Sequence, residues 1–295
     1  MQPIALGDFT IHKFVESTGN MGVPPQAFAG MTDDRLATLR PAMDPRCGDP
    51  ASGLLYLSMH SFVLRTGGKT ILIDTCNGNH KQRSGVMAGM SMLNHDYLGN
   101  LARLGLEPDD IDVVLCTHLH SDHVGWNTKQ DNGRWVPTFP KARYLFSRKD
   151  YDAFDPRRQD WPHYGGTDED TFLDSVLPVV EAGQVEFVDG EHRVGDGLTI
   201  LPCPGHSPGH TALRVEDSGD SGLFTGDSMH HPIQIANTNL NSFTCWDADL
   251  ARASRRKLLE ECCEHHRLLV PGHFAAPHCG RVSPKGSMFQ FEAGA

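Results

Sequence analysis

The chain reads VVLCTHLHSDH over residues 113–123, an apolar run that leads directly into three imidazoles and a carboxylate. A short apolar run such as 113–117 is typical of a buried β-strand. The His/Asp group therefore follows that strand, in a loop or at the start of the next helix. Neutral imidazole and carboxylate are the usual ligands of zinc and of the neighbouring divalent metals. The stretch predicts a metal site at the strand end; the alternative is a polar surface turn, in which three histidines within six residues would be unusual.

Three later segments each run from an apolar strand into a turn that carries another metal-binding side chain. They are LTILPCPGHSPGH at 198–210, LFTGD at 223–227 and LLVPGH at 268–273. Glycine and proline end each strand and let the backbone turn sharply, so that the next side chain can point into a shared cavity. Because strand ends on one side of a sheet converge in space, we expect these turns to meet the 118–123 group.

The order HxHxDH, glycine-flanked His, Gly-Asp and Pro-Gly-His resembles the metallo-β-lactamase fold superfamily. It is similar in particular to the dinuclear hydrolases of that superfamily, the lactonases, glyoxalase-II-like thioesterases and methyl-parathion-hydrolase-like enzymes. The resemblance covers residues from about Leu55 to Phe274. It implies an α/β fold, an αββα sandwich of two mixed β-sheets with helices on the outer faces. Periodicity alone supports only a mixed α/β chain.

The resemblance also implies a ligand set for two divalent metal ions, which we expect to be zinc, with manganese, cobalt or iron as alternatives. The first ion would be held by His118, His120 and His206, the second by Asp122, His123 and His273, and both by Asp227 as a bridge. Asp74 ends the apolar run 70–73 and matches the aspartate that supports the ligands in the family pattern.

Two other side chains of the 203–210 turn are candidates for the same role. His210 lies four residues after His206 and competes with it as a ligand, but in the family pattern the first histidine binds the metal. A ligand histidine usually needs a partner on its other nitrogen, and His210 could be near the site for that reason. Cys203 is close to a proposed ligand, although Asp227 already fills the bridging position.

The function implied by the resemblance is that of a dinuclear metal-dependent hydrolase acting on ester bonds. A metal-bridging hydroxide would attack a small carboxylic ester or lactone, and phosphotriesters are a further substrate class. Asp122 is the expected proton shuttle. His230 stands three residues after Asp227, where acyl-homoserine-lactone lactonases commonly carry a tyrosine. It could donate a proton or hydrogen bond to the substrate oxygen; packing is the alternative, and His231 shares both interpretations.

Two other classes of function use this fold. Iron-binding relatives apply the same ligand set to oxidoreductase or sulfur-transfer chemistry, as in persulfide dioxygenases and flavodiiron-like proteins. Non-catalytic members serve as binding or structural proteins, but they typically lose ligands, and this chain retains them all. Metal content and colour separate the first class from a dizinc hydrolase.

Composition favours a soluble enzyme with a small-molecule substrate. The formal net charge of −11 over 295 residues argues against nucleic acid or an anionic membrane as a partner. No apolar stretch approaches the ~20 residues that span a bilayer, and residues 1–8 do not read as a secretory signal, so we expect a cytoplasmic protein whose cysteines are reduced. The implied ligands are spread over residues 118–273 and must come together in space, so we expect one domain, 1–295. The tail 281–291 is expected to close a sheet edge, or to form a homodimer contact with the N-terminal loop.

Periodicity predicts the remaining elements. An apolar stripe at residues 93, 97, 98, 101 and 104 predicts a core helix, and further helices are expected over 170–180 and 249–265. The last helix should bury Leu250, Ala253, Leu258 and Cys262 and expose Arg252, Arg255, Arg256 and Lys257. The long loop 17–53 should be functional or pack on a neighbour. The charged loop 151–169 is either a lid or an exposed loop.

Overall fold

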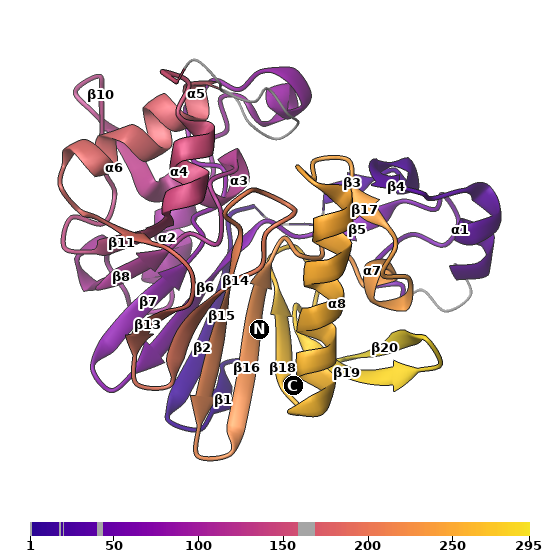
Figure 1. Ribbon diagram of the computed structural model, residues 1–295. Coiled ribbons are helices and arrows are strands. Elements are labelled where there is room, and N and C mark those ends of the chain that lie inside the picture. Colours follow the sequence, from indigo (N-terminus) through magenta and orange to yellow (C-terminus); the bar gives the residue numbers. More distant parts are fainter. Residues whose placement is uncertain (1, 18, 20, 40–43, 159–168) are drawn as a thin grey trace.

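Two seven-stranded β-sheets pack face to face in the computed structural model, which describes residues 2–17, 19, 21–39, 44–158 and 169–295. Helices cover the outer face of each sheet, so the layers run helix, sheet, sheet, helix (Figure 1). Both sheets contain parallel and antiparallel pairs. The predicted αββα sandwich is therefore confirmed.

The first sheet has the strand order β1-β2-β6-β7-β8-β11-β12. Its N-terminal strands pair antiparallel, whereas β7, β8, β11 and β12 pair parallel, so that several of them end on the same edge. The strands are β1 (Ile4–Leu6), β2 (Phe9–Val15), β6 (His60–Thr66), β7 (Lys69–Ile73), β8 (Val113–Leu115), β11 (Arg143–Ser147) and β12 (Val185–Val188).

The second sheet has the order β13-β14-β15-β16-β18-β19-β20. Its central pair, β16 and β18, is parallel, and the other pairs are antiparallel. The hairpin β19–β20 closes the edge, as predicted for the tail. The strands are β13 (His192–Gly195), β14 (Leu198–Pro202), β15 (Thr211–Asp217), β16 (Asp220–Gly226), β18 (Leu268–Pro271), β19 (Gly280–Lys285) and β20 (Met288–Ala293).

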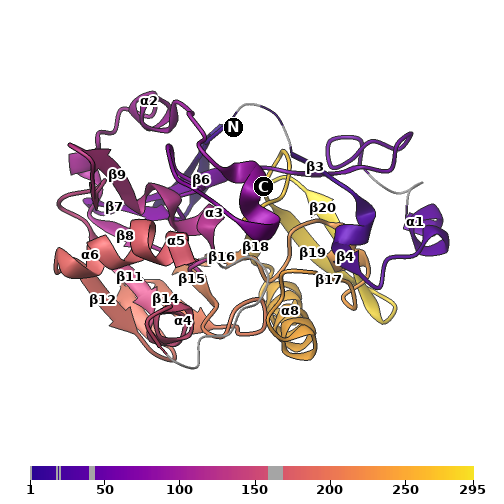
Figure 2. The ribbon, with the colours of Figure 1, turned by 90° about the horizontal axis from the view of Figure 1, so that it is seen from above.

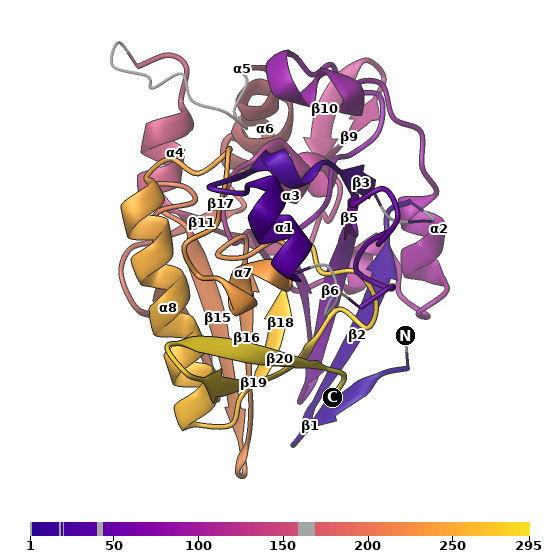
Figure 3. The same ribbon diagram turned by 90° about the vertical axis from the view of Figure 1, so that its right-hand side faces the viewer.

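Alternating apolar side chains build three packed layers. Ile11, Leu64 and Leu115 of the first sheet meet Ile200 and Phe224 of the second between the sheets. The opposite faces pack under helices, with α2, α4 and α6 on the first sheet and α8 on the second (Figures 2 and 3). The α-helices are α1 (Asp33–Leu39), α2 (Tyr97–Ala102), α3 (Ser121–Val124), α4 (Arg148–Phe154), α5 (Glu169–Thr171), α6 (Leu177–Glu181), α7 (Ile233–Ala236) and α8 (Ala248–Glu264).

The N-terminal loop 17–53 contains short elements that pack on other segments of the same chain, as expected for a loop of its length. β3 (Met21–Val23) pairs with β5 (Leu55–Leu57), and β4 (Phe28–Ala29) pairs with β17 (Asn241–Ser242). These segments lie together with α1 beside the end of the second sheet (Figures 1 and 3). A further hairpin joins β9 (Thr128–Asp131) to β10 (Arg134–Pro137), and 3₁₀ turns cover Pro25–Ala27, Gly85–Met90, Pro108–Asp110 and Gly125–Asn127.

The helix predictions are correct in position and wrong in several details. The helix expected over 170–180 is α5, a π-helical turn at Phe172–Val176 and α6. The stripe from Leu93 forms a helix only from Tyr97 onward. In α8 the prediction is wrong for Ala253, which is exposed, and for Arg255, which is fully buried. A periodicity argument treats each arginine as polar, but the guanidinium of Arg255 finds buried oxygen acceptors.

One further prediction reaches beyond the described residues. The proposed lid 151–169 includes residues 159–168, which lie outside the described part of the chain. All eight cysteines are described, and each is a free thiol. Among the described helices none combines the length and apolar character needed to cross a membrane.

Candidate metal centre

The seven residues predicted as ligands come together at one end of the sandwich. Each comes from a loop or short helix that follows a buried strand: β8 leads to the first four, β14, β16 and β18 to the others. Helix α3, which carries two of them, lies near the middle of the molecule seen from above (Figure 2). The residues are His118, His120, Asp122, His123, His206, Asp227 and His273.

The carboxylate of Asp227 is the centre of this group. Its side chain is only 4% exposed, and its Oδ2 atom faces the Nε2 atoms of five histidines. The distances are 3.1 Å to His230, 3.2 Å to His273, 3.3 Å to His123, 3.4 Å to His206 and 3.9 Å to His118.

Two clusters of candidate ligand atoms correspond to the two predicted ligand sets, and a third group, His118, His123 and Asp227, links them. In one, His120 Nδ1 lies 3.0 Å from His118 Nε2 and 2.9 Å from His206 Nε2. In the other, Asp122 Oδ2 lies 3.4 Å from His273 Nε2, and Asp122 Oδ1 lies 3.7 Å from His123 Nε2. Within each cluster the candidate ligand atoms lie within 4.8 Å of one another. This arrangement is compatible with two ions that share one carboxylate.

The protonation of two facing histidines tests whether the site suits a cation. His123 Nδ1 donates to Asp74 Oδ2 at 2.9 Å, and His273 Nδ1 donates to the carbonyl oxygen of Ser58 at 3.2 Å. A neutral imidazole has one N–H, so in their neutral forms both rings carry a lone pair on Nε2, and these atoms face each other at 3.1 Å. Such a contact is repulsive unless a proton or a metal ion lies between the rings. The donor set of imidazole and carboxylate fits a divalent metal.

Burial and neighbouring charges together set the pKa values of the candidate ligands. Burial, reinforced by neighbouring imidazoles, holds the pKa of His118 and His206 well below the usual value. Neutral imidazole is the form that binds metals. Burial opposes the ionisation of Asp227, but the imidazoles of His123 and His273 outweigh it and hold its pKa well below the usual range. Burial alone would lower the pKa of His123 and His273, but the neighbouring carboxylates, Asp227 first, outweigh it and raise the pKa of both imidazoles. The site therefore combines neutral imidazoles with an ionised carboxylate that attracts positive charge.

Asp74 and its neighbours hydrogen-bond to the candidate ligands on the side away from Asp227 Oδ2, through the Nδ1 atom of His123 and the residue next to His118. Asp74 accepts hydrogen bonds from Thr117 N at 2.7 Å and from Thr117 Oγ1 at 2.9 Å as well as from His123. Thr117 Oγ1 lies 3.1 Å from His118 Nδ1 and can accept a hydrogen bond from it. Gly226 allows the close approach of the strands here, because a Cβ atom at this position would lie 2.7 Å from Thr117 Oγ1 and 2.8 Å from His210 Nε2.

The geometry separates His210 from the ligand positions. Its Nε2 accepts from the backbone N–H of Asp227 at 2.9 Å, and its Nδ1 lies 3.0 Å from Cys203 Sγ. Both ring nitrogens are thus engaged with protein atoms, and burial lowers its pKa to about 3. His206, whose Nε2 faces Asp227, occupies the position that the sequence pattern favours.

His230 and His231 have different surroundings. His231 Nε2 donates to the carbonyl oxygen of Cys47 at 2.6 Å, and its Nδ1 accepts from Ile233 N, so this side chain fastens the N-terminal loop. His230 points Nε2 at Asp227, and its backbone N–H is held by Gln234 Oε1 at 2.7 Å. Within the described part of the chain its buried Nδ1 has no hydrogen-bond partner. His206, Asp227 and His230 also have the spacing of a metal-binding group.

Two residues beside the centre were missed by sequence reasoning. The first is Cys245, whose Sγ atom lies 3.7 Å from Nδ1 of the candidate ligand His206. Asp150 is fully buried in α4 and accepts hydrogen bonds from the loop that follows His206. Nothing in the sequence near Cys245 indicated this contact. The pattern Ser147-x-x-Asp150 after a buried strand is typical of a helix start, but it does not indicate which residues Asp150 contacts.

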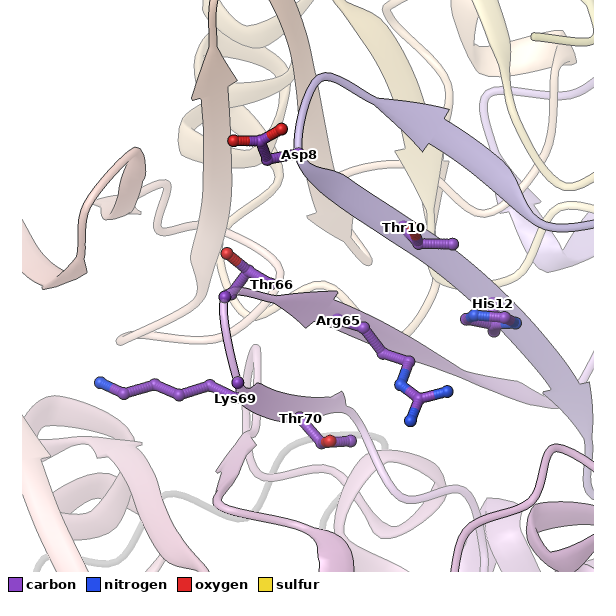
Figure 4. A pocket seen from close by; sticks show the side chains of 9 residues that line it. Asp8, Thr10, His12, Arg65, Thr66, Lys69 and Thr70 are labelled. Carbon is purple, nitrogen blue, oxygen red and sulfur yellow. The ribbon is translucent and has the colours of Figure 1, made fainter.

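A pocket elsewhere on the molecule does not have the character of a second centre. It has a volume of about 430 Å³ and lies at the β6–β7 turn, the end of β7 opposite to Asp74 (Figure 4). Arg65, Lys69 and His12 line it. The side chains of Arg65 and Lys69 point in different directions and do not converge on one point (Figure 4).

Sequence comparison relates the chain to known lactonases. The profile of the Metallo-beta-lactamase superfamily matches residues 57–273. The N-acyl homoserine lactonase AiiA of Bacillus thuringiensis subsp. kurstaki is 27% identical over 231 residues, which cover 75% of this chain and 82% of that protein. The N-acyl homoserine lactonase AttM of Rhizobium radiobacter is 31% identical over 175 residues, 58% of this chain and 60% of that protein.

Structural comparison finds the same fold along nearly the whole chain. AidC, a dizinc quorum-quenching lactonase solved with the product N-hexanoyl-L-homoserine, superposes with a TM-score of 0.79 at 19% identity, covering 100% of this chain and 97% of that one. The hydrolase AbOPH of the beta lactamase superfamily gives a TM-score of 0.80 at 21% identity, covering 99% and 97%. At these identities the likeness concerns the fold.

Proposed function

Since the chain belongs to the metallo-beta-lactamase superfamily, we propose that it is a dinuclear metal-dependent hydrolase that opens lactones or cleaves small carboxylic esters. The observation that carries the proposal is the convergence of histidine Nε2 atoms on Asp227 Oδ2, together with the two candidate clusters. The lactonases among its relatives favour a lactone as the substrate.

The ligands are assigned as the clusters suggest. One ion is held by His118, His120 and His206, the other by Asp122, His123 and His273, and Asp227 contributes to both. The donors are nitrogen and oxygen atoms, which suit zinc as well as manganese, cobalt and iron. Zinc is our first choice because histidines dominate the set.

Two divalent ions bound together lower the pKa of a water molecule towards neutrality and polarise the substrate oxygen. The protein's own groups then have to move protons and stabilise charge. Asp122 is the least buried of the proposed ligands, with 15% of its side chain exposed, and so can exchange a proton with solvent. His230 is held at the centre by Gln234 and can donate a hydrogen bond to the substrate oxygen or leaving group.

The test combines metal analysis with a substrate panel on one preparation. The protein is purified without added metal, its metal content is measured, and hydrolysis of lactones, aryl esters and phosphotriesters is assayed before and after chelation. We expect about two zinc, manganese or cobalt ions per chain and a lactone-opening activity that chelator removes and metal restores.

Other results would redirect the assignment. Iron-containing protein without hydrolytic activity would contradict the proposal and favour oxygen or sulfur chemistry. Protein without tightly held metal would contradict the ligand assignment. Activity confined to phosphotriesters would retain the metal centre and change the substrate class.

Two further expectations accompany the proposal. One domain, 1–295, is supported by the origin of the proposed ligands, which come from both sheets and lie between residues 118 and 273. A single cooperative unfolding transition followed by two probes checks it. The homodimer stays a prediction, which light scattering in solution checks.

A further inference from the structure

A buried carboxylate outside the ligand set lies between two ligand loops. Asp150 belongs to the first turn of α4, directly after β11, and its side chain is fully buried. A carboxylate without water is costly unless hydrogen bonds satisfy its oxygens. In this protein the donors that satisfy it come from the loops that hold the metal-binding histidines.

The contacts of Asp150 are with both loops. Ser207 Oγ donates to its Oδ2 atom at 2.7 Å, and Gly209 N donates to its Oδ1 atom at 2.5 Å. The backbone N–H of Leu119 donates to the same carboxylate. Leu119 lies between His118 and His120, whereas Ser207 directly follows His206. One side chain therefore joins the backbones that carry three histidines of one cluster.

The surroundings of α4 show that this contact is closely fitted. A Cβ atom on Gly209 would lie 2.6 Å from Asp150 N and 2.9 Å from Asp150 Oδ1, so only glycine allows the loop to approach the helix. At the other end of α4, the ring of Phe154 stacks on that of His120, with centroids 5.6 Å apart and planes at 21°. The helix thus supports the cluster at two points.

We propose that Asp150 is a positioning residue for one metal ion only, because it sets the distance between the loop of His118 and His120 and the loop of His206. It touches no ligand side chain and acts through the backbone. The inference rests on the proposed dinuclear centre. Its consequence is selective: the cluster formed by Asp122, His123 and His273 receives no hydrogen bond from Asp150 and keeps its affinity when Asp150 changes.

The experiment compares two Asp→Asn changes in the same helix. Asp150→Asn keeps the shape but leaves one oxygen acceptor where two are used. Asp152→Asn is the matched control, because Asp152 lies two residues away with 44% of its side chain exposed. The affinities of both sites for zinc are measured at pH 8 by competition with a chromophoric chelator, together with the free energy of unfolding. Histidines with ¹⁵N-labelled rings identify by NMR which site loses its ion.

We expect Asp150→Asn to weaken one zinc site about 10–100-fold, the range found for residues that orient metal ligands. The other site should change less than about threefold, and Asp152→Asn should leave both unchanged. Ser207→Ala removes a single donor and should give a smaller loss at the same site. If Asp150→Asn does not fold, the zinc affinities of Ser207→Ala test the inference instead.

Three results would overturn the inference. Two sites of wild-type affinity in folded Asp150→Asn would reduce Asp150 to a packing role. Equal weakening of both sites, in proportion to lost stability, would do the same. Wild-type protein that binds no zinc would overturn the dinuclear function and this inference together, whereas the first two results leave that function intact.

Discussion

Arg255 Nε donates a hydrogen bond of 2.7 Å to the carbonyl oxygen of Ser228, the residue directly after Asp227. The same guanidinium donates to Thr238 O at 2.7 Å and to Asn241 Oδ1 at 2.9 Å, and it is fully buried. Burial lowers its pKa to about 10. Arg255 therefore ties α8 to both ends of the segment that carries His230.

Replacement of Arg255 by methionine should lower stability, because it leaves buried carbonyl oxygens without donors. We expect a loss on the order of 3 kcal/mol in the free energy of unfolding by urea. Lys257→Met, at an exposed position of the same helix, should stay within about 0.5 kcal/mol of wild type. Equal stabilities of the two variants would contradict this role of Arg255.

Asp227→Ala should remove the carboxylate shared by both clusters. We expect occupancy of both metal sites to fall, with affinity losses above the roughly 10–100-fold seen for residues that only orient ligands. Hydrolysis should be abolished while the circular dichroism spectrum stays native. Asp196→Ala, at a fully exposed side chain, is the control. Full activity with two metals retained would remove Asp227 from the site.

His230→Ala distinguishes a catalytic group from a metal ligand. If His230 donates to the substrate oxygen, kcat should fall about 100-fold with both metals retained, and His230→Gln should recover part of it. His265→Ala, at an exposed position, is the control. Loss of one metal ion would instead make His230 a ligand, and unchanged kinetics across the substrate panel would reduce it to packing.

The pH dependence of stability reports the burial of Asp150. Burial raises its pKa to about 7, against about 4 in an unfolded chain. Between these values the folded protein holds a proton that the unfolded chain has released, so this group makes stability fall as pH rises from about 4 to 7. The stability conferred by Asp150 relative to Asp150→Asn should therefore decline over that interval.

The slope of that decline is at most about 1.4 kcal/mol per pH unit. Urea unfolding of metal-free wild type and Asp150→Asn at several pH values gives the difference directly, and the titration of other groups cancels. Parallel curves for the two proteins would mean that Asp150 keeps an ordinary pKa.

Several features of the fold and site follow from local sequence because they depend on near neighbours. The apolar run 113–117 predicted a buried strand, which the structure places at Val113–Leu115, with the His/Asp group just after its end. The repetition of this pattern before His206, Asp227 and His273 predicted a common site. The apolar periodicity of 249–265 predicted α8 to within one residue at each end.

Other features depend on contacts between distant segments, which periodicity does not report. The sequence placed Arg255 on a solvated face, yet oxygen atoms from 228 to 241 surround it. Local sequence does not single out Asp150, because its partners Leu119 and Ser207 are 31 and 57 residues away in the chain.

The sequence by itself determined a mixed α/β chain and the chemical types of the proposed metal-binding side chains, since both depend on residue type and short spacing; the αββα sandwich followed from the resemblance to a family. Only the tertiary structure decided which atoms face the centre. His206 and His210 are equivalent in type, but the backbone N–H of Asp227 engages His210 and leaves His206 facing the carboxylate. Directional hydrogen bonds between segments that meet only on folding made that choice.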